Sequence, residues 1–251
     1  MSTPLVKVDR VGKIFHDSSQ HTTNAIKEVT LDINEGDFLT IFGPNGSGKT
    51  TLLNLVAKIE NPTTGNVEYG KPNLRIGYVF QNYDESLLPW RTVEENINLP
   101  FENYSFKQNE AKSKIEKVIK LLRLEQYRDK YPYMLSGGKK QLTALARALV
   151  IEPDILIMDE PFSSLDFDTT TEMEQLVMEI WRDLNITVLF VSHDIDEAVL
   201  LANKVIVLSH KPSVVNKIID VELDHPRNQE TTVSPLFVEI KKQVIESYGK
   251  I

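Results

Sequence analysis

One stretch decides the fold of this chain, and it reads Gly43-Pro44-Asn45-Gly46-Ser47-Gly48-Lys49-Thr50. It fits the pattern G-x-x-x-x-G-K-[ST], follows an apolar run at Phe38–Phe42 and precedes a helical pattern at Thr51–Lys58. Glycines at these positions let successive backbone N–H groups point at phosphate oxygens, and the N-terminus of the helix adds partial positive charge. We therefore expect a phosphate loop in which Lys49 binds the β- and γ-phosphates and the Thr50 hydroxyl binds Mg²⁺. The alternative is a glycine-rich turn with a solvated lysine.

The regions around this loop alternate between strand and helix patterns, which is typical of an α/β fold. Apolar residues have helical spacing at Met173–Trp181 and Ile115–Leu122, and Ser234-Pro235 is a typical start for a C-terminal helix. Apolar runs predict strands at Leu5–Val8, Asp37–Phe42, Arg75–Phe80, Ile155–Met158, Thr187–Val191 and Lys204–Leu208. Most of these runs are apolar on both faces, so we expect a sheet with helices on both sides.

One segment departs from this alternation. Residues 82–148 contain several helical patterns but no convincing strand, and Pro89, Pro100 and Pro132 are expected to break the helices. We predict a single domain in which residues 1–81 and 149–225 form an α/β core. Residues 82–148 are then an inserted helical subdomain, and residues 226–251 are a C-terminal helical extension.

A pair of carboxylates ends the strand predicted at Ile155–Met158. Asp159 and Glu160 should emerge at the carboxyl end of that strand, where open α/β sheets bind their ligands. Asp159 can hold Mg²⁺, and Glu160 can polarise the water that attacks a γ-phosphate. An acidic pair of this kind is usually solvated loop when it occurs alone. Together with a phosphate loop, it indicates a nucleotide-hydrolysing site.

A second glycine-rich helix start reads Leu135-Ser136-Gly137-Gly138-Lys139-Lys140-Gln141. It is a weak motif alone, because Ser-Gly-Gly helix starts are common, but it predicts a second anion site. Two loops of this kind in one chain suggest that one of them serves the nucleotide of another subunit.

Composition excludes several classes of protein. The 251 residues include 28 Lys and Arg against 36 Asp and Glu, which gives a net charge of −8 and argues against broad binding to nucleic acid or anionic membranes. The absence of cysteine excludes disulfides and thiolate metal sites and suits a reducing cytoplasm. No apolar run is long enough to span a membrane, so we expect a soluble chain or one that reaches a membrane only through a partner.

With these motifs, the chain resembles the ATPase subunit of ATP-binding cassette transporters over about residues 3–225. The motifs that carry the resemblance follow the order of that family: the phosphate loop, Leu135–Gln141, Asp159-Glu160, Ser163-Ser164-Leu165-Asp166 and Ser192-His193-Asp194. The resemblance implies a phosphate-loop NTPase core with an N-terminal antiparallel β part and an inserted helical subdomain.

The resemblance also implies the roles of individual residues. Phe15 would stack on adenine, His193 would contact the γ-phosphate, and Gln81 would contact Mg²⁺ and the attacking water. The implied catalytic residues are Glu160, His193, Gln81 and Lys49, and the implied Mg²⁺ ligands are Thr50, Gln81 and Asp159. The residues expected to bind ATP are Phe15, Gly43, Pro44, Asn45, Gly46, Ser47, Gly48, Lys49, Thr50 and Thr51 and, from the opposite subunit, Ser136, Gly137, Gly138 and Asp166. As alternatives, Gln81 could be a capping residue, His193 a strand-end residue, and Phe15 a packing residue of the sheet.

Within that family, Leu87-Leu88-Pro89-Trp90 and Asp224-His225-Pro226-Arg227 are similar to the nitrate, sulfonate and taurine importer branch. This likeness implies ATP and Mg²⁺ as cofactors, a homodimer on ATP binding, integral membrane permease subunits and an extracytoplasmic solute-binding protein. It places the chain at the cytoplasmic side of the membrane, without nucleic acid as a partner. Two alternatives are a soluble cassette ATPase in cofactor assembly or DNA repair and the ATPase of a lipid or drug exporter.

Trp90 is also a candidate contact for the membrane subunit. Interfaces are enriched in Trp and Arg, and Trp90 is followed by Arg91. Leu87 and Leu88 could equally fold into the core of their own helical segment.

Overall fold

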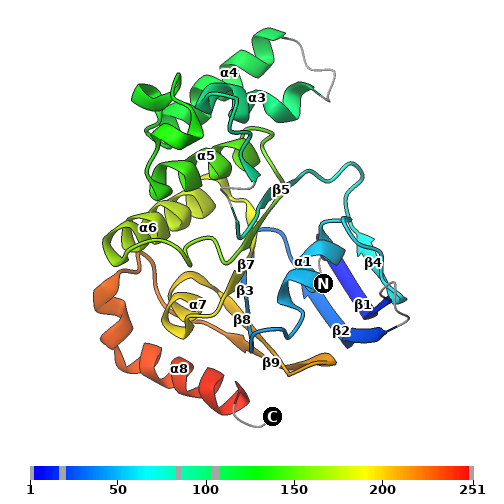
Figure 1. Cartoon of the computed structure of the whole chain (residues 1–251). Coiled ribbons are helices and arrows are strands. Elements are labelled where there is room, and N and C mark those ends of the chain that lie inside the picture. The colour runs from blue at the N-terminus through cyan, green and yellow to red at the C-terminus, as the bar shows by residue number, and fades with distance from the viewer. Residues whose placement is uncertain (1–2, 17–20, 83–85, 103–107, 249–251) are drawn as a thin grey trace. The chain divides into compact units, whose positions relative to one another are not determined.

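The computed structural model describes residues 3–16, 21–82, 86–102 and 108–248. The chain divides into two compact units, which we call unit 1 (Met1–Asn73 and Glu174–Ile251) and unit 2 (Leu74–Met173). Figure 1 shows the helices and strands of both units along the chain.

Unit 1 is built on a sheet with the strand order β4-β1-β2-β9-β8-β3-β7. Its N-terminal part is antiparallel, as predicted: β1 (Val6–His16) pairs with β2 (Thr22–Ile33) and with β4 (Thr64–Tyr69). Its central part is parallel, with β3 (Phe38–Phe42) between β7 (Thr187–Ser192) and β8 (Lys204–Leu208). The strand β9 (Ser213–Asp220) runs antiparallel to β8 and parallel to β2. Every residue of β3 and β7 is buried, which fits their continuous apolar sequences.

Unit 1 contains several helices around its sheet. They are α1 (Lys49–Val56), α7 (Ile195–Leu201), the 3₁₀ helix η3 (Gln229–Val233), α8 (Pro235–Tyr248) and the part of α6 (Phe167–Leu184) that follows Met173. As predicted, α8 starts after Ser234, whose Oγ accepts a hydrogen bond from the Phe237 N–H at 3.3 Å. Phe237, Ile240 and Val244 form the buried stripe of α8.

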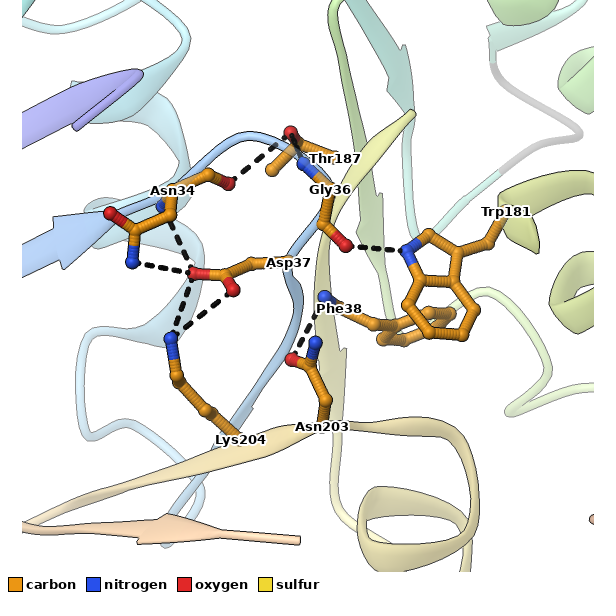
Figure 2. Close-up of polar contacts among 8 residues, drawn as sticks. All are labelled: Asn34, Gly36, Asp37, Phe38, Trp181, Thr187, Asn203 and Lys204. Carbon is orange, nitrogen blue, oxygen red and sulfur yellow. Dashed lines mark hydrogen bonds and ion pairs between the residues drawn. The ribbon is translucent and has the colours of Figure 1, made fainter. Parts of the chain in front are cut away.

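A polar network holds the N-terminal end of β3, away from its phosphate loop (Figure 2). Asp37 is buried, and its carboxylate accepts hydrogen bonds from the Asn34 N–H at 3.0 Å and from the Lys204 Nζ at 3.1 Å. The Trp181 indole N–H donates to the Gly36 carbonyl at 2.9 Å, and the Phe38 N–H donates to Asn203 Oδ1 at 3.0 Å. These bonds satisfy polar groups where β3 begins, and so they fix its register beside β7 and β8.

A buried arginine caps the C-terminal end of the short helix α7. Arg227 is 4% exposed, and its guanidinium donates to the carbonyls of Leu200 at 3.1 Å and Ala202 at 2.7 Å and to the Leu223 carbonyl at 2.8 Å. Burial lowers the pKa of Arg227 to about 10. Because the last carbonyls of a helix lack partners within the helix, this side chain satisfies groups that would otherwise be buried unpaired.

Unit 2 contains two parallel strands, β5 (Ile76–Val79) and β6 (Ile155–Asp159), whose register pairs Val79 with Met158. Its helices are α3 (Val93–Glu102), α4 (Gln108–Leu121), the 3₁₀ helices η1 (Glu125–Tyr127) and η2 (Pro132–Met134), α5 (Gly137–Leu149) and the start of α6. The described residues between 82 and 148 form helices and no strand, as predicted.

Some predictions about the elements are wrong. Pro100 lies inside α3 and does not end it, because only the two residues Phe101 and Glu102 follow it and little of the helix is disturbed. The strand predicted at Leu5–Val8 continues to His16 through β-bulges, and β2, β4 and β9 were missed. These strands carry charged residues on an exposed face, and their apolar runs are short, so the apolar pattern of the sequence does not reveal them as strands. The helix after the second glycine-rich motif includes the glycines, so it starts at Gly137 and not at Leu142.

Candidate functional site

The phosphate-loop motif forms a tight turn between β3 and α1 in unit 1. Gly46 and Gly48 have φ values of +77° and +86°, a left-handed conformation that favours glycine. A Cβ atom on Gly48 would lie 3.1 Å from the Ala25 carbonyl oxygen. Lys49 is 5% exposed, and its Nζ folds back to donate to the carbonyls of Gly43 at 3.0 Å and Pro44 at 3.3 Å. The loop therefore holds an ammonium group next to its own backbone, as a site for phosphate requires.

The start of α1 also fits an anion. Its N-cap is Gly48, which has no side chain to accept from the first N–H groups, and no acidic residue lies in its first turn. The Ser47 Oγ is buried and has no hydrogen-bond partner among the described atoms, while the Thr50 side chain is exposed. Because an unpaired buried hydroxyl is unfavourable, a phosphate oxygen at this position would satisfy Ser47.

His193 belongs to the same edge of the unit 1 sheet. In the parallel pair of β3 and β7, Phe42 is opposite Ser192, so Gly43 and His193 leave neighbouring strands at their carboxyl ends. His193 is exposed, and the next residue, Asp194, caps α7 by accepting from the Asp196 N–H at 2.8 Å. This cap sets where the chain turns after His193.

The predicted catalytic carboxylate lies in unit 2. Gln81 and Glu160 follow the carboxyl ends of β5 and β6, and Gln81 Nε2 donates to Glu160 Oε2 at 3.0 Å. Glu160 has a φ value of +44°, which is unusual for a residue with a side chain. Asp159 is 3% exposed, and the burial of Tyr78, together with the charge of Asp159, raises the pKa of Tyr78. The structure thus places Gln81 in contact with Glu160, which directly follows the buried Asp159 in the chain.

Ser136, Gly137 and Gly138 form the start of α5. Ser136 is the exposed N-cap, but its side chain makes no capping hydrogen bond, and the helix has no acidic residue in its first turn. A Cβ atom on Gly138 would lie 2.8 Å from Thr169 Cγ2, so a larger residue there would require Thr169 to move. These N–H groups of the first turn can therefore bind an anion from outside the helix.

Asp166 has a structural role that the sequence did not predict. Its carboxylate accepts from the Thr169 N–H at 3.0 Å and from Thr169 Oγ1 at 2.8 Å, and these bonds lower its pKa. The spacing Asp-x-x-Thr is a recognisable helix start, so a capping search would have found it. Thr169 thus donates hydrogen bonds to Asp166 and also packs against Gly138.

Comparison with known protein families shows which family has this fold and these motifs. The family model described as ABC transporter matches residues 26–163, which is more than half of the chain. The chain belongs to the ABC transporter family. The solved dimeric ATP-binding cassette MJ0796, in a post-hydrolysis state bound to ADP and Pi, is similar to this ABC ATPase with a TM-score of 0.74 and 30% identity. It covers 87% of this chain and 100% of its own chain.

Two curated relatives of this ABC ATPase carry names that include a transported solute. The aliphatic sulfonates import ATP-binding protein SsuB of Bacillus cereus is 35% identical over 97% of this chain and 95% of the relative. The nitrate import ATP-binding protein NrtC of Synechococcus elongatus is 37% identical over 95% of this chain and 37% of the relative. The predicted family, fold and ATPase activity are confirmed.

Phe15, which the ABC ATPase is predicted to use for stacking on adenine, is an exposed side chain. Phe15 is 37% exposed on β1, and Lys13 Nζ lies 4.8 Å from the centroid of its ring. An aromatic ring with an accessible face can stack on a base. Among residues 3–16, 21–82, 86–102 and 108–248, no group of three or more His, Cys, Asp or Glu residues could hold a metal ion. No helix in that same part of the chain could cross a membrane.

The buried carboxyl group of Glu174, which interacts electrostatically with Asp194, should make the free energy of unfolding depend on pH. Burial raises the pKa of Glu174 from its ordinary 4.5 to about 7, and the charge of Asp194 adds to this rise. The folded protein therefore binds more protons than the unfolded chain between these values, so stability from this group is lost as pH rises from about 4.5 to 7. We expect Glu174→Gln to increase the free energy of unfolding by about 1–3 kcal/mol at pH 8 and little at pH 4.5.

Urea unfolding at both pH values would measure this effect. Glu179→Gln is the matched control, because Glu179 is exposed on the same helix. Parallel pH profiles for the wild-type chain and the Glu174→Gln variant would contradict the prediction.

Proposed function

We propose that this chain is the ATP-hydrolysing subunit of an importer for a small anion or organic solute of the nitrate, sulfonate and taurine type. The observation that carries the proposal is the 35–37% identity to sulfonate and nitrate import proteins over at least 95% of this chain. The Leu87–Trp90 segment and the acidic net charge of −8 are consistent with it. Residues 83–85, which precede this segment, lie outside the described part of the chain.

The proposed nucleotide chemistry follows from the groups described above. Lys49 and the N–H groups at the start of α1 bind the phosphates of ATP, and Ser47 Oγ satisfies its hydrogen-bonding capacity there. Glu160, held by Gln81, orients the attacking water. His193 contacts the γ-phosphate, and Phe15 stacks on adenine.

Mg²⁺ fits the donor types of this set. Thr50, Gln81 and Asp159 offer the oxygen ligands that Mg²⁺ prefers, and phosphate oxygens and water complete such sites. When bound, the ion neutralises charge that develops on the phosphates.

Two subunits would complete each site. We propose that the chain forms a homodimer on ATP binding, in which Ser136, Gly137, Gly138 and Asp166 act on the nucleotide of the opposite subunit. The dimeric cassette MJ0796 supports this arrangement. The exposed N-cap Ser136, without a capping bond of its own, leaves the start of α5 available for that γ-phosphate.

The membrane permease subunits are expected to dock near Trp90. Leu87 is buried and Leu88 is partly exposed, whereas Trp90 is 70% exposed, so the tryptophan is the large apolar side chain of this segment that is most accessible to a partner. Its loop is held in place by Asn96, which is fully buried and donates to the Leu88 carbonyl at 3.1 Å and the Arg91 carbonyl at 3.0 Å. Arg91 is ion-paired with Glu102. A rigid loop that presents one tryptophan is typical of an interface hot spot.

Replacing Trp90 by Ala should weaken assembly with the permease subunits by about thirtyfold, which corresponds to about 2 kcal/mol. Nucleotide binding by the isolated chain should stay near normal, because Trp90 is not among the residues expected to bind ATP. Titration of the purified chain against detergent-solubilised permease would measure the change. Leu121→Ala, at a 39% exposed position on α4, is the control. Unaltered assembly of a well-folded Trp90→Ala chain would show that the anchor lies elsewhere.

The transport proposal itself can be tested in cells. A tagged chain should co-purify integral membrane proteins from solubilised membranes and place the ATPase at their cytoplasmic side. Cells lacking the chain should lose uptake of an alkanesulfonate or of nitrate, and the external solute-binding protein should be required for it. Recovery from the cytosol alone, without membrane proteins, would favour the alternative of an ATPase in cofactor assembly. Loss of export in place of uptake would favour a lipid or drug exporter.

A further inference from the structure

We propose that the C-terminal helix α8 positions the phosphate loop and that Tyr248 is the residue through which it does so. This inference rests on the nucleotide site proposed above. Tyr248 is a positioning residue, because it would act on the nucleotide site through its contact with Phe42. The inference concerns unit 1 alone, in which α8 lies beside α7, β8 and β9 (Figure 1).

Several contacts anchor α8 before it reaches Tyr248. Its side chains Phe237, Ile240 and Val244 are buried, and its first turn is capped by Ser234. Lys241 Nζ forms an ion pair with Asp196 at 2.5 Å, in the first turn of α7. The end of the helix therefore has a defined position relative to the sheet.

At that position, the last turn of α8 meets the strand that leads into the phosphate loop. The rings of Tyr248 and Phe42 have centroids 5.6 Å apart and are tilted by 53°. Phe42 is the last residue of β3, and it is 8% exposed. Aromatic pairs at such distances attract each other beyond the effect of buried area. The contact restricts the ring of Phe42, while the pairing with Ser192 and Val207 restricts its backbone.

Phe42 is joined directly to the groups that hold Lys49. The next residue is Gly43, whose carbonyl accepts a hydrogen bond from Lys49 Nζ at 3.0 Å. Gly43 is also packed closely, since a Cβ atom there would lie 3.1 Å from the Leu208 carbonyl oxygen. A displacement of Phe42 would therefore move the Gly43 carbonyl and with it the lysine ammonium. Because that ammonium binds phosphate, its placement should set nucleotide affinity.

The consequence differs from a general loss of stability. Removing the ring of Tyr248 should leave the fold intact, since this residue is 37% exposed on the last described turn, but it should free Phe42 to adopt other positions. Nucleotide affinity should then fall, whereas turnover at saturating ATP should change little, because Glu160 and His193 are not part of this contact.

The test compares Tyr248→Ala with Tyr248→Phe and with Ile245→Ala in the full chain. Ile245 lies on the same helix and is 51% exposed, so it serves as the matched control. Binding of a fluorescent ADP derivative should weaken about three- to tenfold in Tyr248→Ala, and the KM for ATP should rise by a similar factor with kcat within about twofold. Tyr248→Phe should restore both values, because the ring makes the contact. Ile245→Ala should match the wild-type chain. Melting temperatures would confirm that all variants are folded, and Tyr248→Leu replaces Tyr248→Ala if the latter is not.

Equal ADP affinity of the wild-type and Tyr248→Ala chains would overturn this inference. An equal loss in Ile245→Ala, or a failure of Tyr248→Phe to restore affinity, would do the same. If the wild-type chain itself failed to bind the derivative, the proposed nucleotide site would be wrong, and this inference would fall with it.

Discussion

Replacing Glu160 by Gln should reduce steady-state ATP hydrolysis at least about a hundredfold, while ATP binding persists. The amide keeps the shape of the carboxylate and can still contact Gln81, with which Glu160 is hydrogen-bonded at 3.0 Å. It cannot act as the base toward the attacking water. With ATP and Mg²⁺, the variant should therefore accumulate as a stable dimer, visible by light scattering.

The control for this experiment is Glu172→Gln, which changes an exposed glutamate of the same unit and should retain activity. A Glu160→Gln chain that hydrolyses ATP normally would remove Glu160 from the mechanism. A variant that stays monomeric at saturating ATP would instead contradict the proposed dimer.

Ser136→Arg should abolish hydrolysis without preventing the monomer from binding ATP. Ser136 is exposed at the start of α5, in unit 2, whereas the phosphate loop belongs to unit 1. An arginine there would bring bulk and charge to the γ-phosphate that the opposite subunit holds. We expect a loss of hydrolysis of about a hundredfold or more, since positioning and electrostatic stabilisation supply most of this catalysis. Binding of a fluorescent nucleotide and phosphate release would measure the two effects separately.

Mixing two inactive variants would test whether sites are shared between subunits. Lys49→Ala should weaken nucleotide binding, because it removes the ammonium that is held beside Gly43 and Pro44. A dimer of Lys49→Ala with Ser136→Arg keeps one composite site free of both changes. Activity in the mixture above that of either variant alone would support completion in trans. Full activity of Ser136→Arg by itself would show that the start of α5 has no part in hydrolysis.

The motifs allowed much of the candidate site to be predicted, because the chemistry of phosphate binding prescribes residue types and spacing. Lys49 begins the helix α1 after the loop that follows β3, and Gln81 and Glu160 follow the ends of β5 and β6, where the alternation of strands and helices placed them. The family and the α/β fold followed from the same pattern. Apolar runs also placed the buried strands β3, β7 and β8 within one residue of their observed limits.

The parts that could not be predicted depend on contacts between distant residues. Arg227 caps α7 from 25 residues further along the chain, and no local pattern reveals such a bond. The strands β2 and β9 pair in parallel although nearly 200 residues separate them, and their exposed charges conceal them. The pairing of Tyr248 with Phe42 likewise depends on the path of α8.

The backbone of Glu160 has a consequence for engineering the stability of this enzyme. With φ at +44°, a glutamate here costs about 1 kcal/mol or more relative to a residue that adopts this conformation freely. Glycine would relieve that strain, and a search for thermostable variants would select it. The same exchange would delete the carboxylate proposed to orient water. Selection for heat resistance and selection for turnover thus act in opposite directions at this one position, so an engineered library should keep it unchanged.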